Sequence, residues 1–290
     1  MSMSVRQKVP DPVKRAGRRA YVGAGTATAG LRLDPGFIVI GAQRCGTTSL
    51  FRALMAHPQV VRPTFHKGIN YFDLNYHRGV RWYRGHFPLA KIARARAARY
   101  GEPVAFEASG YYLYHPFAAE RIARDLPAVT LVAILRDPVE RAFSAYKHEY
   151  ARGFERKSFE DALESEDDRL AGEVEQMRQD PGYESFPHRH YSYRHRGHYS
   201  EQLERVFDYF PRTQCYIMES ERYFDQPALE YSKLLAFLGL CSFEPPRFDR
   251  YNARPSPPMR AQTRRALEEY YSLHDERLAK LLGRPPTWAR

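Results

Sequence analysis

The chain has 290 residues, 43% of them hydrophobic and 27% charged, which is the composition of a globular protein large enough to bury a full core. No run of about 18 apolar residues occurs, so we expect no stable membrane insertion. The N-terminus has no continuous apolar stretch, so a secretory signal is not expected, while its arginines leave an organellar targeting segment open.

The net charge and the cysteines restrict the class of protein further. The formal net charge is +11, and residues 1–33 hold seven of the cations against one anion. A site for a polyanionic small ligand would account for much of the remaining excess, so nucleic acid is not expected as a partner. The three cysteines lack metal-ligand spacing, and their odd number argues against a disulfide framework, which indicates a reducing, cytoplasmic location.

Apolar runs and helical patterns alternate along most of the chain. Residues 1–34 are basic, then rich in Gly, Ala and Thr, and predict a disordered tail before one domain at residues 35–290. Strands are predicted at residues 37–40, 69–72, 104–107, 128–135 and 215–218. Helices are predicted at residues 48–56, 116–124, from 138 through 146, 199–210, 227–239 and 262–282. This alternation predicts an α/β fold of three layers, a parallel sheet with helices on both faces.

Residues 154–190 interrupt the alternation. They are rich in charge, with a capping-box pattern at Ser158-Phe-Glu-Asp161, and then rich in Pro, Gly, His and Tyr. A surface insertion or lid over a ligand cleft fits this composition, and so does a solvated helix and loop without a role in binding.

A glycine-bounded turn joins the first predicted strand to the first predicted helix. The spacing Gly41-x4-Gly46-Thr47-Thr48 is that of a phosphate-binding loop, where backbone N–H groups and the helix dipole favour an anion. Nucleotide triphosphatases carry a lysine where this chain has Thr47, and the cation here is Arg44. The amides of Cys45, Gly46, Thr47 and Thr48 therefore predict an anion site that is not built for ATP hydrolysis.

A second motif follows the strongest predicted strand. Arg136 precedes Asp137 and Pro138, which predict a helix start, and Ser144 lies about two helical turns later. An arginine at the carboxyl end of a parallel strand faces the crevice where open α/β sheets bind ligands, and its guanidinium suits a phosphate. Taken alone, Arg136 could equally pair with Asp137 or cap the helix.

The two motifs together resemble the sulfotransferases that use 3′-phosphoadenosine 5′-phosphosulfate (PAPS). The similarity covers roughly residues 36–288 and is greatest to the heparan-sulfate type branch and its bacterial relatives. It includes Asn75-Tyr-His-Arg-Gly-Val-Arg-Trp82-Tyr83, Gly197-His-Tyr199 and the ending from Arg254 to Trp288.

The resemblance implies a set of donor-binding residues. The 5′-phosphosulfate would lie on Arg44 and residues 45–48, and the 3′-phosphate on Arg136, Ser144 and Arg254, with Tyr199 also at the donor site. It implies in-line sulfuryl transfer without a metal, leaving adenosine 3′,5′-bisphosphate (PAP) as product, and Lys67 near the leaving oxygen or the acceptor.

The chain departs from the family where the general base is expected. The family has a glutamate at the position of Gly68, a lysine at that of Ala108 and a Lys-Gly-Arg loop at residues 252–254. If residues 66–72 are extended, His66 and position 68 share a face, and Glu107 ends a predicted strand at the crevice. Both Glu107 and His66 are candidate bases, and an acceptor acidic enough to need no base is the third possibility.

Other functions remain open at this point. A small-molecule kinase with a degenerate phosphate loop and a non-catalytic PAPS-binding protein both fit the loop. Histidines at residues 188, 190, 195 and 198 do not form a defined zinc set, so no metal is expected. The acceptor is expected to be a glycan or a small molecule, which includes natural products and lipids, and the oligomeric state is not determined.

Overall fold

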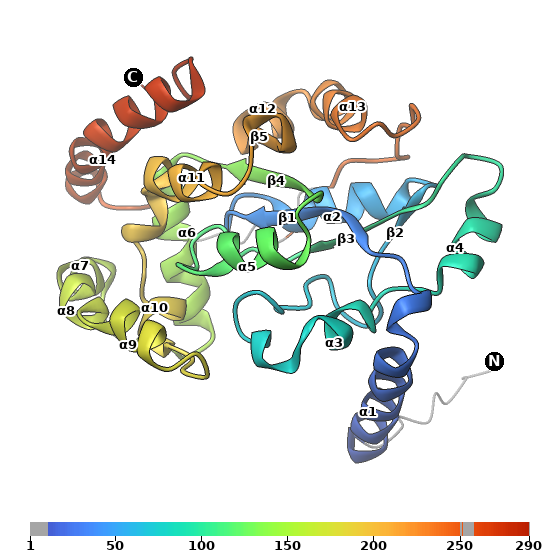
Figure 1. Ribbon diagram of the computed structural model, residues 1–290. Coiled ribbons are helices and arrows are strands. Elements are labelled where there is room, and N and C mark those ends of the chain that lie inside the picture. The colour runs from blue at the N-terminus through green and yellow to red at the C-terminus, as the bar shows by residue number, and fades with distance from the viewer. Residues whose placement is uncertain (1–10, 250, 252–257, 290) are drawn as a thin grey trace, which may run out of the picture.

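The computed structural model describes residues 11–249, 251 and 258–289 (Figure 1). Its centre is a five-stranded parallel sheet in the order β2-β3-β1-β4-β5. The strands are β1 (Pro35–Gly41), β2 (Val60–Val61), β3 (Val104–Ala108), β4 (Thr130–Leu135) and β5 (Cys215–Glu219). β1 and β4 are buried along nearly their whole length, which explains why their sequences are continuous apolar runs rather than alternating ones.

Helices cover both faces of this sheet, so the predicted α/β fold is confirmed. The helices between β1 and β5 are α2 (Thr47–Ala56), α3 (Val80–Arg84), α4 (Ala90–Ala97), α5 (Ala118–Asp125), α6 (Pro138–Ala151), α7 (Phe159–Glu164), α8 (Glu166–Leu170), α9 (Glu173–Gln179), α10 (Phe186–His190) and α11 (Tyr199–Phe207). After β5 follow α12 (Ser220–Asp225), α13 (Pro227–Phe237) and α14 (Ala261–Leu282). The chain moves from β1 toward one sheet edge and from β3 toward the other, so right-handed crossovers place α2 and α5 on opposite faces.

The predicted disordered tail is wrong for the part of it that the structure describes. Helix α1 (Asp11–Ala27) precedes β1 and projects from the body of the protein (Figure 1). The Tyr21 ring packs edge-on against Phe65, with ring centroids 5.1 Å apart. Gly25 lies so close to Gly85 that a Cβ on it would come within 2.3 Å of the Gly85 carbonyl oxygen. Small residues, which weaken the hydrophobic pattern, are what permit this backbone contact.

The strand predicted at residues 69–72 is also absent from the described segment. Asn70 has a φ of 54°, and residues 71–74 form a turn. The apolar side chains there are buried because the aromatic rings of Tyr71 and Phe72 pack under α3, not because they belong to the sheet.

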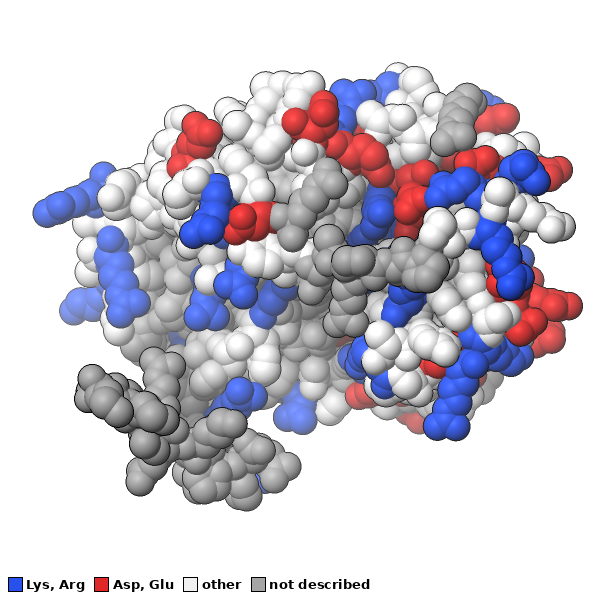
Figure 2. Space-filling view, turned by 180° about the vertical axis from the view of Figure 1, so that it is seen from behind, with Lys and Arg blue, Asp and Glu red and all other residues white. Residues whose placement is uncertain are grey.

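Surface charge is unevenly distributed. Figure 2 shows acidic and basic side chains mixed over the flank formed by α7 to α9. On the flank near α4, most charged side chains are basic, and they lie among uncharged residues. α4 contributes exposed Lys91, Arg94 and Arg96 there, and of these Arg94 pairs with Glu102 at 2.6 Å.

Candidate active site

The loop between β1 and α2 has the backbone geometry of an anion site. Gly46, the N-cap of α2, is in the left-handed conformation with a φ of 98°. A Cβ at Gly46 would lie 3.1 Å from the Phe224 ring, so both backbone and space favour glycine. The first N–H groups of a helix have no partner within it. Here they face a cavity of about 680 Å³ at the carboxyl ends of β1 and β4, as expected for an open parallel sheet.

The two sequence motifs meet at this cavity. Arg44, with a φ of 72°, donates from Nε to Ser144 Oγ at 3.0 Å. Arg136 donates to the Arg44 carbonyl at 3.3 Å and lies 3.6 Å from the carboxylate of Glu140. The structure thus brings Arg44, Arg136 and Ser144 together. It places the Arg44 guanidinium beside Ser144, on the side where the sequence analysis expected the 3′-phosphate.

A lysine from another segment lies at the start of α2. Lys67 donates from Nζ to Thr47 Oγ1 at 2.8 Å and to Thr48 Oγ1 at 3.3 Å. Its ammonium therefore occupies the region that the lysine of a phosphate loop would reach, although Thr47 stands at that position in the sequence. Burial lowers the pKa of Lys67 to about 8, because the charged form loses solvation.

Of the two predicted bases, Glu107 does not line the cavity. Its side chain is fully buried and accepts hydrogen bonds from Ile69 N at 2.7 Å, Ser109 Oγ at 2.8 Å and Tyr112 OH at 2.9 Å. Burial raises the pKa of this carboxyl to about 7 despite these bonds. Glu107 therefore has a structural role, because it holds the segment after Lys67 against β3.

The other predicted base, His66, is exposed and also lies off the cavity wall. Because the segment is not extended, Lys67 and Asn70 line the cavity together, and the expected alternation of faces fails. Gly68, at the family's glutamate position, has no room for a side chain. A Cβ there would lie 2.5 Å from Ser109 Oγ and 2.7 Å from a backbone carbonyl oxygen.

Cys45 and Tyr199 lie behind the loop rather than in the cavity. Cys45 is fully buried, its Sγ lies 3.6 Å from the Tyr199 hydroxyl, and burial raises the pKa of the thiol to about 11. The Tyr199 hydroxyl donates to the Arg136 carbonyl at 2.9 Å. Both residues therefore pack against the two motifs on the side away from the cavity. Arg254, the remaining predicted donor ligand, lies outside the described residues.

The sequence analysis missed much of the basic lining. The described lining residues include seven Lys and Arg side chains and two carboxylates. The cations are Arg44, Lys67, Arg136, Lys147, Arg152, Arg189 and Arg196, and the carboxylates are Glu140 and Glu221. Arg189 and His190 come from α10, within the segment predicted to be an insertion. The only sequence signal was the charge and histidine content of that segment.

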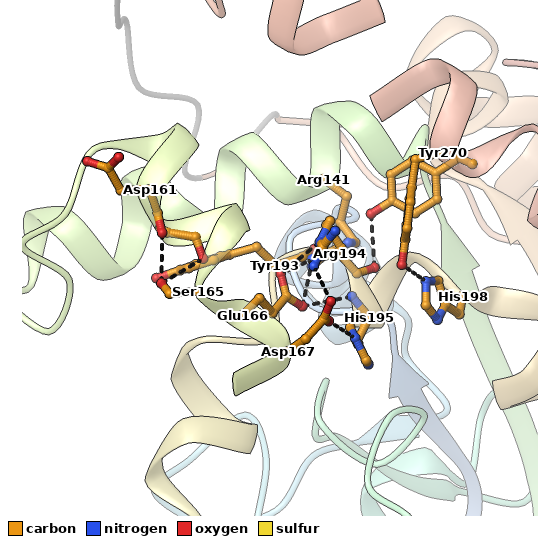
Figure 3. Close-up of polar contacts among 12 residues, drawn as sticks. Arg141, Asp161, Ser165, Glu166, Asp167, Tyr193, Arg194, His195, His198 and Tyr270 are labelled. Atoms are coloured by element: carbon orange, nitrogen blue, oxygen red, sulfur yellow. Dashed lines mark hydrogen bonds and ion pairs between the residues drawn. The ribbon is translucent and has the colours of Figure 1, made fainter. Parts of the chain in front are cut away.

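Two acidic residues, buried Glu166 and exposed Asp167, fasten this segment to the chain before α11 (Figure 3). Glu166, with no exposed surface, accepts from Arg194 N at 2.7 Å and His195 N at 2.9 Å. Asp167 pairs with the side chains of the same two residues at 2.9 and 2.8 Å. The wall of the cavity that α10 provides is therefore attached to the rest of the fold through α8.

Comparison with known proteins identifies the family to which this chain belongs. The family model described as "Sulfotransferase domain" matches residues 34–254. The chain belongs to the sulfotransferase domain family. Helix α1 lies before the matched residues, and α14 lies after them.

Similar proteins include both solved structures and curated relatives. The crystal structure of a sulfotransferase from Alicyclobacillus acidocaldarius is 30% identical, covers 88% of this chain and 98% of its own, and superposes with a TM-score of 0.64. The human bifunctional heparan sulfate N-deacetylase/N-sulfotransferase 3 is 28% identical over 88% of this chain. The mouse heparan sulfate glucosamine 3-O-sulfotransferase 5 is 30% identical over 75% of this chain. This sulfotransferase spans 31% of the length of the first relative and 56% of the second.

The membrane prediction can be compared with the helices of the structure. Among the residues described, no helix has both the length and the apolar character needed to cross a membrane.

Proposed function

We propose that this protein transfers a sulfuryl group from PAPS to a hydroxyl or amine of a sugar or small-molecule acceptor. The observation that carries the proposal is the meeting, in one cavity, of the α2 N-terminus, Lys67, Arg136 and Ser144, with Ser144 hydrogen-bonded to Arg44. A nucleotide with phosphate-like groups at both its 5′ and 3′ positions uses both ends of this set. A nucleotide with only a 5′ chain leaves Arg136 and Ser144 without a ligand.

The cavity fits such a donor in size and in charge. About 680 Å³ is the volume of a site for a drug-sized ligand, and the excess of cations matches a polyanion. The amides at the start of α2 and Lys67 would hold the 5′-phosphosulfate, and Lys67 would stabilise the negative charge that develops on the leaving 5′-phosphate oxygen. Arg136 and Ser144 would hold the 3′-phosphate, and Arg44 would bridge the two ends.

Three further cations of the cavity suggest an acceptor that carries negative charge. Lys147 of α6, Arg152 at the C-cap of α6 and Arg189 of α10 line the cavity and are not among the residues assigned to the donor. Relatives named for heparan sulfate, a polyanionic glycan, are consistent with such an acceptor. The cytoplasmic location and the absence of a nucleic-acid partner stay predictions.

A small-molecule kinase is the main competing function. It needs a carboxylate for Mg²⁺ after a buried strand, and Asp137 is the positional candidate. Its carboxylate instead accepts from Val139 N at 2.8 Å and Glu140 N at 3.4 Å, as the N-cap of α6. The geometry therefore supports sulfuryl transfer over phosphoryl transfer.

Ligand-linked thermal stability distinguishes these functions. PAP without metal is expected to stabilise the protein by about 2.7 kcal/mol at a hundredfold excess over its dissociation constant. Arg136→Ala should reduce this shift, while Arg96→Ala, on the exposed face of α4, should not. A larger shift with ADP and Mg²⁺ that a chelator abolishes would favour the kinase. Labelled PAPS incubated with a panel of hydroxyl and amine acceptors then separates an enzyme from a binding protein.

A further inference from the structure

The chain lacks the family's glutamate at position 68, and neither Glu107 nor His66 lines the cavity, so the acceptor proton needs another destination. His190 does line the cavity. We propose that His190 is the general base of this enzyme and that Glu149 orients it. This inference rests on the proposed sulfuryl transfer.

The first support is a histidine–carboxylate pair at the cavity wall. His190 Nδ1 lies 3.0 Å from Glu149 Oε2, which is hydrogen-bond distance. Glu149 comes from α6 and is 2% exposed. A buried carboxylate on Nδ1 fixes the proton there, so the other ring nitrogen, Nε2, is the basic atom. The same carboxylate stabilises the imidazolium that forms when Nε2 takes a proton.

The second support is the way the ring is held. Phe154 packs edge-on against it at 4.8 Å and Phe186 lies against it at 4.5 Å, as measured between ring centroids. The His190 side chain is 9% exposed, so little of it faces bulk water. A base held in one orientation at a cavity wall supplies part of the geometry that proton abstraction needs, and the acceptor must supply the rest by binding within hydrogen-bond reach.

The third support is a connection from α10 to the donor loop. Arg196 donates to Gln43, the residue before Arg44, and its other Nη donates to the carbonyls of His188 and Arg189 at 3.2 and 2.6 Å. The guanidinium also lies 4.8 Å and 5.0 Å from the ring centroids of Tyr111 and Tyr114.

Arg196 is 4% exposed, and its guanidinium is hydrogen-bonded to Gln43 and to the two α10 carbonyls. It thus positions His190, the next residue after Arg189, at a fixed place relative to the loop that holds the donor.

The proposed transfer moves one sulfuryl group and one proton. The acceptor oxygen or nitrogen forms a bond to sulfur while the bond from sulfur to the 5′-phosphate oxygen breaks. The acceptor proton passes to His190 Nε2, and the 5′-phosphate oxygen leaves with the bonding electrons beside Lys67. The imidazolium then returns its proton to water. Glu149 of α6 pairs with His190, and Arg152, the C-cap of α6, has its Nη1 3.4 Å from the same carboxylate oxygen. Arg196 of η3 (His195–Gly197) is also close enough to Glu149 to interact with it electrostatically.

The test compares His190→Gln with His195→Gln. His195 makes the same kind of pair, with Asp167 at 2.8 Å, but does not line the cavity. Labelled PAPS at saturation is offered with two probes, 4-nitrophenol, whose hydroxyl is acidic, and methyl glucoside, whose hydroxyls are not. We expect His190→Gln to lower kcat for methyl glucoside by about 10²–10⁴ and for 4-nitrophenol by less than tenfold. PAP affinity should stay unchanged, and His195→Gln should resemble the parent with both probes.

The pH dependence gives a second readout. Parent kcat for methyl glucoside should rise with pH along one acid limb that His190→Gln abolishes. Glu149→Gln should lower kcat for methyl glucoside and leave PAP affinity unchanged, because the ring loses the partner that orients it. Equal losses with the two probes, or a kcat of His190→Gln within threefold of the parent, would overturn the assignment. No transfer by the parent to either probe or to the wider acceptor panel would count against the proposed function itself.

Discussion

Lys67 offers the sharpest test of how the donor site works. Its Nζ lies 2.8 Å from Thr47 Oγ1, at the first turn of α2, where the leaving oxygen of a bound donor would lie. A unit charge about 4 Å from another is worth about 4 kcal/mol at an effective dielectric constant near 20. Only the part that grows between ground state and transition state raises the rate. If between half and all of this interaction energy develops only in the transition state, Lys67→Met lowers kcat by about 30-fold to 1,000-fold.

The pKa of Lys67 predicts the pH dependence and the stability of the variants. Since that pKa lies at about 8, below the ordinary value for lysine, the charged form prevails below pH 8 and is lost as pH rises through that value. Parent kcat/KM for PAPS, which reports the free enzyme, should therefore fall above about pH 8, and Lys67→Arg should move the fall to higher pH. Burial disfavours the ammonium, so Lys67→Met should match or exceed the parent in Tm without ligand.

The assay is the initial rate of sulfate transfer from labelled PAPS, at saturating donor for kcat and at limiting donor over a series of pH values for kcat/KM. A kcat of Lys67→Met within threefold of the parent would refute the role at the leaving oxygen. So would an alkaline fall that Lys67→Arg leaves in place. A lower Tm of Lys67→Met without ligand would show instead that the lysine supports the fold.

Two other residues give further predictions. Arg136→Ala should weaken PAP binding, measured by calorimetry, about 10-fold to 100-fold. It should leave kcat at saturating donor within about threefold of the parent, because a remote phosphate contact is made equally in the ground state and the transition state. A larger loss in kcat than in affinity would contradict this. Glu107 has a pKa raised to about 7, so the folded state binds more protons than the unfolded state between about pH 4.5 and 7, and the free energy of unfolding should fall as pH rises through that window. In urea denaturation at pH 5 and pH 8, Glu107→Gln should lose this difference while keeping kcat within about threefold; a kcat loss beyond that would restore Glu107 as a candidate base.

The sequence predicted the fold and the donor motifs because both depend on local patterns. A buried parallel strand is a short apolar run, and the Gly41–Thr48 turn and the Asp137–Pro138 helix start carry their own residue signatures. Lys67 illustrates what such patterns cannot give. Its position beside Thr47 depends on how the irregular segment after β2 folds back, and that path is set by the buried Glu107 and by Asn70 in the left-handed region.

The candidate base shows the same limit at longer range. The assignment of His66 required an extended segment, and the assignment of Glu107 required its strand to end in the open crevice. Glu107 is instead covered by the segment it holds. His190 and Glu149 are 41 residues apart and meet only because α10 returns to α6, which no spacing in the sequence reveals.

The cation-rich cavity has a kinetic consequence for the proposed reaction. When the sulfuryl group departs it carries one negative charge away, but the 5′-phosphate left behind gains an ionisable oxygen. The nucleotide is therefore nearly as anionic after the reaction as before it, and the cations assigned to the donor, Arg44, Lys67 and Arg136, would hold the product about as firmly as the donor. Release of the spent nucleotide, speeded by salt that screens these charges, would then limit steady-state turnover, and accumulated product would compete with fresh donor.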